Sequence, residues 1–469
     1  MNKNIFLYLI VFSMALFVVS CEDALEIEPE QELSIDAAFS DEATTMASLM
    51  GAYSRCQDLE VFGALPQVIA EYQADNVNFI GTFPTLQDIN QYVTLSSNTS
   101  IEAIFRDNYR AILAANAVIQ NAPGVDDPGF SDEEKAQVVA EAKFVRAMVY
   151  FNLLNMFAQP YNVNNGGEEG VALVLEPDVL NGVTNFPARS TVAECYAQIE
   201  KDLTEALPNL PADGTRIRAT QGAANALLSR LYLYKGDNGN AASRAQMVIG
   251  NAFYAAATDY NFYDNETPEA VFSLDMSPTD NSRTGTGGWA SYFRPAEEGA
   301  RGDAPLSADL IAAFDPADKR LTDLTSVGAN GETYSLKYDD PVTNSDNSPL
   351  IRISEMHLNA AEALTKSTNA VTQDILDLVN PLRQRAGLAD WTTGDFADAN
   401  ELLTAILDER RKELNCEGHR KMDLLRNGMP LRTSGFGAGI SSPGDDLVVL
   451  PIPQREIDLG SSLPQNPGY

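Results

Sequence analysis

The sequence contains few of the residues on which catalytic and metal sites most often depend. Its 469 residues include two histidines, four cysteines and two tryptophans. Basic residues are scarce as well, because 32 Lys and Arg stand against 66 Asp and Glu, for a formal net charge of -34. Proteins that bind nucleic acid neutralise phosphates with clustered Lys and Arg, and no basic cluster follows the N-terminal segment. Nucleic acid is therefore a poor partner for this chain.

Common catalytic signatures are missing too. The chain has no G-x-S-x-G elbow, no H-E-x-x-H helix, no Walker loop and no G-x-G-x-x-G turn. His357 lies in a predicted helix and His419 lies in a charged C-terminal motif, so we expect structural roles for both. We expect no catalytic residue and no cofactor. An enzyme with two opposed carboxylates remains an alternative, because the chain has 66 acidic residues from which such a pair could come.

Oxygen-bearing side chains gather in two predicted loops. They are Asp259, Asn261 and Asp264 in the first loop, and Asp339, Asp340 and Asp346 in the second. Calcium prefers oxygen ligands, but neither loop has the spacing of a calcium-binding loop between two helices. We therefore expect solvated loop acids and no metal site.

Three cysteines lie beyond the N-terminal segment, at Cys56, Cys195 and Cys416. Each falls in a stretch with helical periodicity, and no two have the spacing of a metal or redox pair. Their odd number argues against a disulfide framework. We expect three buried thiols that pack as small apolar side chains.

The N-terminus has the layout of a lipoprotein signal peptide. Lys3 precedes an apolar run over residues 5–19, which ends at Ser20 and Cys21. This run is short for a membrane-spanning helix, and a small residue directly before cysteine suits cleavage with lipid attachment. We predict a signal peptide over residues 1–20 and an acylated Cys21; an ordinary cleaved signal is the alternative. The acidic residues 21–34 then form a polar tether.

Amphipathic periodicity predicts helices along most of the remaining chain. The expected ranges are 41–59, 101–121, 132–157, 192–207, 221–235, 239–251, 353–364, 371–386, 400–415 and 420–426. Two short apolar stretches, Ala270–Leu274 and Leu447–Ile452, are candidate strands. Unusually long connections cover residues 75–97, 160–189, 259–305 and 327–349, and such loops on a rigid scaffold often carry binding residues.

Sequence signals at helix starts support these ranges. Ser131 is followed by Glu134, and Thr191 is followed by Glu194, and both pairs have the spacing of a capping box. Successive helices with short links, as in residues 220–234 and 240–249, indicate helix-turn-helix pairs that stack on a shared core.

The expected domain organisation is one body over residues 21–469. It has four parts: the tether 21–34, an N-terminal helical part 35–255, a loop-rich insert 256–349 and a C-terminal helical part 350–469.

Several spaced motifs follow one another along the chain. They include EAKFVRAMVYFNLLNMFAQPY from Glu141, TQGAANALLSRLYLYKGDNGNAASRAQMVI from Thr220, LIRISEMHLNAAEAL from Leu350, VNPLRQRAGL from Val379, ILDERRKELNCEGHRKMDLLRNG from Ile406, LPIPQREI from Leu450 and QNPGY from Gln465. These motifs resemble those of the SusD/RagB family. The motifs follow the family's order over nearly the whole chain. Together with the paired helices, the resemblance implies a mainly α fold with tetratricopeptide-like helix-turn-helix repeats, long irregular loops and few short strands.

The resemblance also implies a function. Members of this family are surface lipoproteins that capture glycans, or less often peptides, and pass them to a SusC-like TonB-dependent barrel transporter. We therefore expect a glycan ligand, such a transporter as partner, and an outer-membrane location with the lipid anchor at Cys21. The alternatives are a surface carbohydrate-active hydrolase and a peptide-binding or purely structural surface lipoprotein.

Charged residues are dense near the C-terminus, at Glu409, Arg410, Glu413, Glu417, Arg420, Asp423 and Arg426. Spacings of three and four place many of them on one helical face. We interpret them as a structural network of ion pairs rather than as a ligand site. Arg146 near Glu141 and Arg352 near Glu355 are interpreted in the same way, because a buried arginine must be paired.

Candidate ligand contacts lie in two of the long loops. They are Asp75, Asn76, Asn78, Phe79 and Phe83 in the first loop, and Trp289, Tyr292, Phe293 and Arg294 in the second. A sugar ring can place its C–H face against an aromatic ring while amide and charged groups satisfy its hydroxyls. The alternative interpretation is that these aromatic rings pin the loops to the body.

Overall fold

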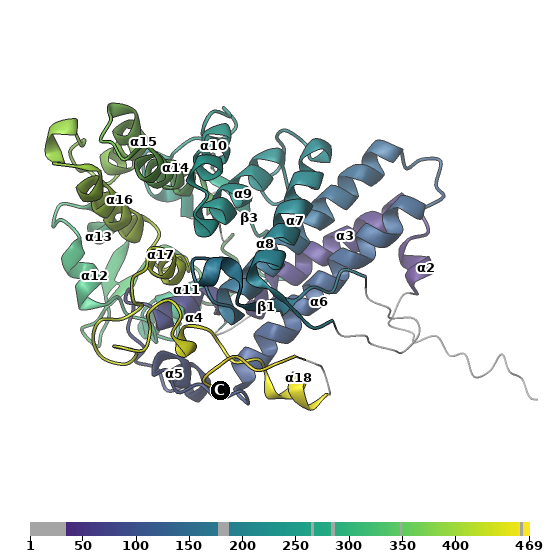
Figure 1. Ribbon diagram of the computed structural model, residues 1–469, viewed down its shortest axis with the longest axis horizontal. Coiled ribbons are helices and arrows are strands. Elements are labelled where there is room, and N and C mark those ends of the chain that lie inside the picture. Colours follow the sequence, from purple (N-terminus) through teal and green to yellow (C-terminus); the bar gives the residue numbers. More distant parts are fainter. Residues whose placement is uncertain (1–33, 177–186, 264–266, 283–286, 348, 460–462) are drawn as a thin grey trace, which may run out of the picture.

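The computed structural model describes residues 34–176, 187–263, 267–282, 287–347, 349–459 and 463–469 (Figure 1). The predicted signal peptide, the tether up to residue 33, and Cys21 lie outside this range. So does Asp264 of the first candidate calcium loop. Within the described residues, no helix combines the length and apolar character needed to cross a membrane.

Long helices form a continuous array along the molecule (Figure 1). In chain order they are α3 (Glu42–Gln57), α6 (Thr99–Asn121), α7 (Asp132–Phe157), α8 (Val192–Ala206), α9 (Gln221–Lys235), α10 (Asn238–Ile249), α14 (Ile353–Thr368), α15 (Gln373–Arg385) and α16 (Ala399–Glu413). From α3 to α10 each helix packs on the next, and α10 packs on α14 although the insert separates them in the chain. Helix α14 in turn packs on both α15 and α16. This arrangement is the mainly α fold of stacked helix pairs that the sequence predicts.

Local signals set the ends of these helices. Both predicted capping boxes are present. The hydroxyls of Ser131 and Thr191 accept the backbone N–H groups of Glu134 and Glu194, respectively. The two glutamate carboxylates in return accept the backbone N–H groups of the cap residues. Helix α9 ends at Gly236, which has a φ of 83°. Glycine adopts this left-handed conformation without strain, so the chain can turn directly into α10.

Shorter helices and strands complete the described part of the fold. The helices are α2 (Ile35–Ala38), α4 (Leu65–Gln73), α5 (Pro84–Asn90), α11 (Trp289–Phe293), α12 (Ala308–Ala313), α13 (Lys319–Thr322), α17 (Arg420–Arg426) and α18 (Gln454–Asp458). The strands form three antiparallel pairs: β1 (Glu169–Ala172) with β2 (Arg189–Thr191), β3 (Ala270–Ser273) with β6 (Pro349–Arg352), and β4 (Thr325–Val327) with β5 (Thr333–Ser335). The register of β3 with β6 places Phe272 opposite Ile351.

Most buried apolar side chains belong to one large core. It extends from α3, α6 and α7 through α8 and α9 to β3, β6 and α11. From residue 140 to its C-terminal end, helix α7 is buried around most of its circumference and contributes its apolar side chains to this core. A separate cluster, which includes Leu376 and Ile406, joins α14, α15 and α16.

Some sequence expectations are wrong in detail. Residues 447–452 form no strand, because Pro451 and Pro453 lack the N–H groups that a ladder requires, and only a short 3-10 turn appears at Asp446–Val448. Seven short helices of the described residues were not predicted: α2, α4, α5, α11, α12, α13 and α18. Of these, α5 and α11 lie inside expected loops. Cys56, Cys195 and Cys416 are buried as expected, but Cys416 lies in a turn with a φ of 59° and not in a helix.

Candidate ligand-binding surface

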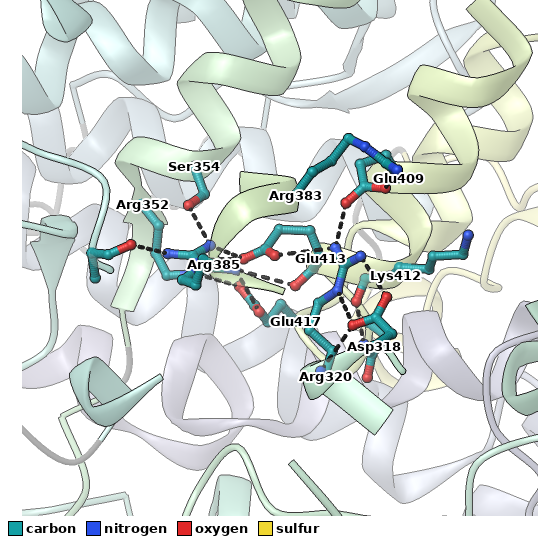
Figure 2. Close-up of polar contacts among 12 residues, drawn as sticks. Asp318, Arg320, Arg352, Ser354, Arg383, Arg385, Glu409, Lys412, Glu413 and Glu417 are labelled. Atoms are coloured by element: carbon teal, nitrogen blue, oxygen red, sulfur yellow. Dashed lines mark hydrogen bonds and ion pairs between the residues drawn. The ribbon is translucent and has the colours of Figure 1, made fainter. Parts of the chain in front are cut away.

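The charged C-terminal motif forms a buried network of ion pairs (Figure 2). Glu413 is at its centre: its Oε1 lies 2.6 Å from Arg385 Nη2 and 3.1 Å from Arg352 Nη1, and its Oε2 lies 3.4 Å from Arg320 Nη1. Burial alone would raise the pKa of Glu413, but the charges of the three arginines outweigh it and lower the pKa to about 2. The carboxylate is therefore ionised wherever the protein is folded at moderate pH.

The network connects segments that are distant in the chain. Arg320 belongs to α13, Arg352 ends β6, Arg385 ends α15, and Glu409 and Glu413 come from α16. All five side chains are at most 1% exposed, so none offers a surface to a ligand. A buried charge that loses its partner is strongly unfavourable, and each pair therefore holds two segments together.

The other charged residues of the motif are paired in the same way. Arg410 Nε lies 2.8 Å from Asp423 Oδ2, and Arg426 contacts Asp423 and both carboxylate oxygens of Glu362. The interpretation of this motif as a structural network is therefore confirmed.

Arg146 and Arg352 are also paired, but with partners that the sequence did not indicate. Arg146 binds Asp202 of α8, whereas its sequence neighbour Glu141 binds Arg218. Arg352 binds Glu269, Glu413 and Glu417, whereas Glu355 binds Arg230.

The two loops that carry the predicted ligand contacts lie side by side. Val77 pairs with Leu306 in an isolated antiparallel bridge. Backbone hydrogen bonds of 2.9 Å from Asn78 to Pro305 and of 3.0 Å from Ile80 to Asp303 extend this contact. The structure therefore brings together two segments that the sequence placed more than two hundred residues apart.

The polar residues of the first loop have different surroundings. Asp75 forms a bidentate pair with Arg420, at 2.6 and 2.8 Å. Burial would raise the pKa of Asp75, but Arg420 and then Arg411 outweigh it and lower that pKa below its ordinary value. Asn76 is buried and accepts a 2.8 Å hydrogen bond from Arg411 Nε. Asp75 and Asn76 thus anchor the loop to α16 and α17, while Asn78 is exposed.

The aromatic residues of the second loop are buried. Trp289, Tyr292 and Phe293 form the short helix α11 and are 5%, 3% and 0% exposed. The Trp289 ring centroid lies 5.0 Å from that of Tyr338, and its indole N–H donates to the carbonyl of Phe62 at 3.3 Å. The rings therefore pin α11 to the body, as the alternative interpretation predicts, and they present no face to solvent. Their role as ligand contacts stays a prediction without a supporting contact.

Phe83 is the predicted aromatic contact that lies open, with half of its side chain exposed. The Arg301 guanidinium carbon lies 5.3 Å from the centre of the Phe83 ring and 4.8 Å from the centre of the Tyr292 ring. Arg301 Nε also donates a 2.7 Å hydrogen bond to Asp303. Arg301 thus contacts both rings, and of the two rings Phe83 is the half-exposed one; we call Phe83, Arg301 and Tyr292 the Phe83 stack.

Phe79 and Arg294 are the remaining predicted ligand contacts, and both make contacts within the protein. Phe79 is half-buried, with its ring 5.1 Å from that of Tyr72 in an edge-to-face contact. Arg294 Nε lies 2.5 Å from Glu298, and its Nη1 donates to the carbonyl of Tyr338 at 2.8 Å. Sequence reasoning did not find Arg301 or Asp303, because neither lies in an apolar stripe or a recognisable motif. Arg301 and Asp303 belong to the candidate surface because the two loops pair with each other.

Comparison with known proteins identifies the class of protein. A profile described as the SusD family matches residues 330–469, and a profile described as starch-binding, associating with outer membrane, matches residues 23–233. SusD-like protein P2 of Formosa agariphila is 26% identical and covers 98% of this chain and 99% of its own length. The starch-binding protein SusD of Bacteroides thetaiotaomicron is 24% identical and covers 73% of this chain and 74% of its own.

Solved structures give the same result. A SusD superfamily protein from Bacteroides thetaiotaomicron has a TM-score of 0.79 at 27% identity, over 93% of this chain and 100% of that one. A putative sugar binding protein from Bacteroides vulgatus has a TM-score of 0.79 at 26% identity, over 91% of this chain and 98% of that one. A laminarin binding SusD-like protein shares the fold, with a TM-score of 0.74 at 23% identity. This chain belongs to the SusD/RagB-like family, as its motifs predict.

Proposed function

We propose that this protein is a cell-surface lipoprotein that binds a glycan at the Phe83 stack and delivers it to a SusC-like TonB-dependent transporter in the outer membrane. The observation that carries the proposal is the half-exposed ring of Phe83, which lies against the Arg301 guanidinium in a loop that also contains the exposed Asn78. An aromatic ring flanked by amide and charged groups suits the C–H face and the hydroxyls of a sugar. Starch-binding and laminarin-binding relatives support a glycan as ligand.

The described carboxylates beside this surface favour binding over hydrolysis. Glycoside hydrolysis needs one carboxyl group as acid and an opposed one as base or nucleophile. Asp75 is held by Arg420, and Asp303 is held by Arg301. For Asp75 this partner outweighs the effect of burial and holds its pKa below the ordinary value, which does not suit a general acid.

The first prediction is binding without turnover. Purified protein applied to a glycan array is expected to retain at least one glycan, and chromatography of that glycan after long incubation should show no shortened product. Boiled protein is the control for background degradation. Reproducible cleavage would establish the hydrolase alternative, and retention of peptides alone would establish the peptide-binding alternative.

The second prediction concerns Phe83. Phe83→Ala is expected to weaken binding of the retained glycan by about 1–2 kcal/mol, since aromatic anchors at binding sites contribute on this scale. The melting temperature should hardly move, because half of the side chain is already exposed. Phe436→Ala is the matched control, because Phe436 is a similarly exposed phenylalanine on a different loop. Equal losses of affinity in both variants would contradict the assignment.

The third prediction concerns the anchor. Cys21→Ser is expected to abolish incorporation of a fatty-acid analogue and to release the protein from the membrane fraction, because an acylated cysteine supplies the hydrocarbon that holds the protein there. Glu22→Gln keeps the cysteine and should fractionate like the natural protein. Continued labelling of Cys21→Ser would show that another residue is acylated.

A further inference from the structure

Arg301 is the cationic side chain that contacts the half-exposed ring of Phe83. Its guanidinium carbon lies 5.3 Å from the centre of this ring and 4.8 Å from the centre of the Tyr292 ring. The backbone N–H of Arg301 donates to the carbonyl of Ser291 in α11 at 2.8 Å. A guanidinium is the group with which an acidic ligand forms its strongest hydrogen bonds. Whether an acidic ligand can use Arg301 depends on the charges that already surround it.

Asp303 compensates the charge of Arg301 within the same surface. Its Oδ2 accepts a 2.7 Å hydrogen bond from Arg301 Nε, and the side chains of Asp303 and Arg301 are 12% and 15% exposed. The carbonyl of Asp303 accepts the backbone N–H of Ile80 at 3.0 Å. A Cβ atom on Gly81 would lie 2.5 Å from Oδ1 of Asp303, so the carboxylate lies directly against the backbone that leads to Phe83. Because salt screens a mostly buried pair only weakly, the pair adds no net charge beside the ring.

The other charges of the two paired segments do not favour an anion. No Lys or Arg occurs within residues 56–105. The segments 75–97 and 287–306, both described completely, contain five acidic residues, Asp75, Asp88, Glu297, Glu298 and Asp303, against two basic ones, Arg294 and Arg301. Arg294 is paired with Glu298, and Arg301 is paired with Asp303. Each arginine of these segments therefore has a carboxylate partner.

Arginines from the C-terminal part approach the first segment but are also engaged. Arg420 binds Asp75, and Arg411 binds Asp75 and Asp309. Arg432 donates to three backbone carbonyl groups, and its guanidinium carbon lies 5.8 Å from the centre of the Tyr92 ring. With a formal net charge of -34 on the whole chain, an approaching anion meets engaged arginines in a negative field.

We propose that this site selects an uncharged glycan over acidic ones, and that Asp303 is the residue that determines this selectivity. The inference rests on the proposed function, because it names the class of glycan that binds there. A uronic-acid or sulfated sugar loses part of its hydration on binding, and that loss is not offset where each nearby arginine already has a partner. The hydroxyls of an uncharged sugar can donate to a carboxylate and accept from an amide or a guanidinium. Asp303 thus acts against the wrong ligand by compensating Arg301.

A glycan array of matched pairs tests the class of ligand. Each neutral polymer, such as a galactan or a mannan, is printed beside the uronic-acid polymer of the same sugar. The full-length natural protein is expected to retain the neutral members, with an affinity that does not change between about 20 and about 500 mM NaCl, because salt screens interactions between charges. Preferential retention of an acidic member would contradict the inference and leave the proposed function standing. Retention of no glycan at all would contradict the proposed function.

Asp303→Asn is the matched variant. Its amide oxygen keeps the size of the side chain and can still accept from Arg301 Nε, but the charge of Arg301 is no longer compensated. The ratio of its affinity for an acidic glycan to that for the neutral counterpart should rise about fivefold, which is the effect of one unit charge at about 4 Å in a water-like dielectric. In the double variant Asp303→Asn/Arg301→Gln this gain should be lost, because no cation remains beside the ring.

Glu102→Gln is the control for the change in net charge, because it removes one negative charge from a pair with Arg455 that is not part of the stack. Its ratio of affinities should equal that of the natural protein. An unchanged ratio in Asp303→Asn, or an equal rise in Glu102→Gln, would show that Asp303 does not determine the selectivity.

Fluorine NMR provides a test that needs no retained glycan. With 4-fluorophenylalanine at position 83, sodium glucuronate is expected to shift the resonance saturably in Asp303→Asn at concentrations that leave the natural protein unchanged. Equal behaviour of the two proteins would overturn the inference. A saturable shift in the natural protein would do so even if Asp303→Asn did not fold. This result separates failure of the inference from failure of the proposed function.

Discussion

Glu413→Gln is expected to lower the free energy of unfolding by about 3–5 kcal/mol. The substitution keeps the size of the side chain and removes its charge. Arg385 and Arg352 each keep another carboxylate, Glu269, but both lose their contact with the central anion, and Arg320 loses one of its three acidic partners. The remaining buried positive charge is then compensated only in part. Urea denaturation followed by circular dichroism measures the loss.

Two further variants make the Glu413 result interpretable. Glu102→Gln removes an ion pair with Arg455 whose arginine side chain is 56% exposed, and exposed pairs contribute less than about 1 kcal/mol. Should Glu413→Gln not fold, Glu409→Gln tests the same network more mildly, because Arg320 keeps Asp318. Equal destabilisation by Glu102→Gln and by the network variants would show that burial of the network does not matter.

Stability is expected to fall steeply in acid, and Glu413 should account for about 3 kcal/mol of the loss. Its pKa is 4.5 as a free side chain and about 2 in the folded protein, so its stabilisation is fully present above 4.5 and is lost as the pH falls towards 2. Glu362 and Glu417 also have lowered pKa values, because for each of them the charge of a buried arginine outweighs the effect of burial. Their contributions should have the same sign.

Thermal melts of the natural protein and of Glu413→Gln across this pH range check the acid prediction. The two curves of stability against pH should be far apart near neutrality and approach each other as the pH approaches 2, because protonation of Glu413 then removes the same charge as the substitution. Parallel curves would show that the paired arginines do not lower the pKa of Glu413.

Helix positions followed from local signals in the sequence. Helix α7 was predicted with its observed ends, because Ser131 and Glu134 form a capping box and the apolar residues that follow have helical spacing. The same holds for α9, which begins after Thr220 and ends at Gly236. Short elements such as α11 were missed, since five residues are too few for periodicity to show and packing against the core determines their conformation.

The candidate surface was predictable only in part. The long polar connection over residues 75–97 predicted an exposed segment, and Phe83 in it is half exposed; its contact with a ligand stays a prediction. Exposure of each ring was not predictable: Phe83 is open, whereas Trp289 and Phe293 are buried although all three lie in similar sequence surroundings. Whether a loop aromatic faces water depends on which distant segment covers it.

The ion-pair partners of the buried charged residues were likewise predictable only in part. The helical periodicity and the family motifs were determined by the sequence alone, because they depend on neighbouring residues. The same is true of the expectation that arginines within apolar stripes are paired, because an unpaired buried charge has a high free energy. Only the tertiary structure decided that Arg146 pairs with Asp202, that Arg420 holds Asp75, and that Arg301 lies beneath Phe83. Such contacts join residues far apart in the chain. The stacking of the helices determines which acidic residue each arginine contacts, and local residue spacing does not encode that long-range arrangement.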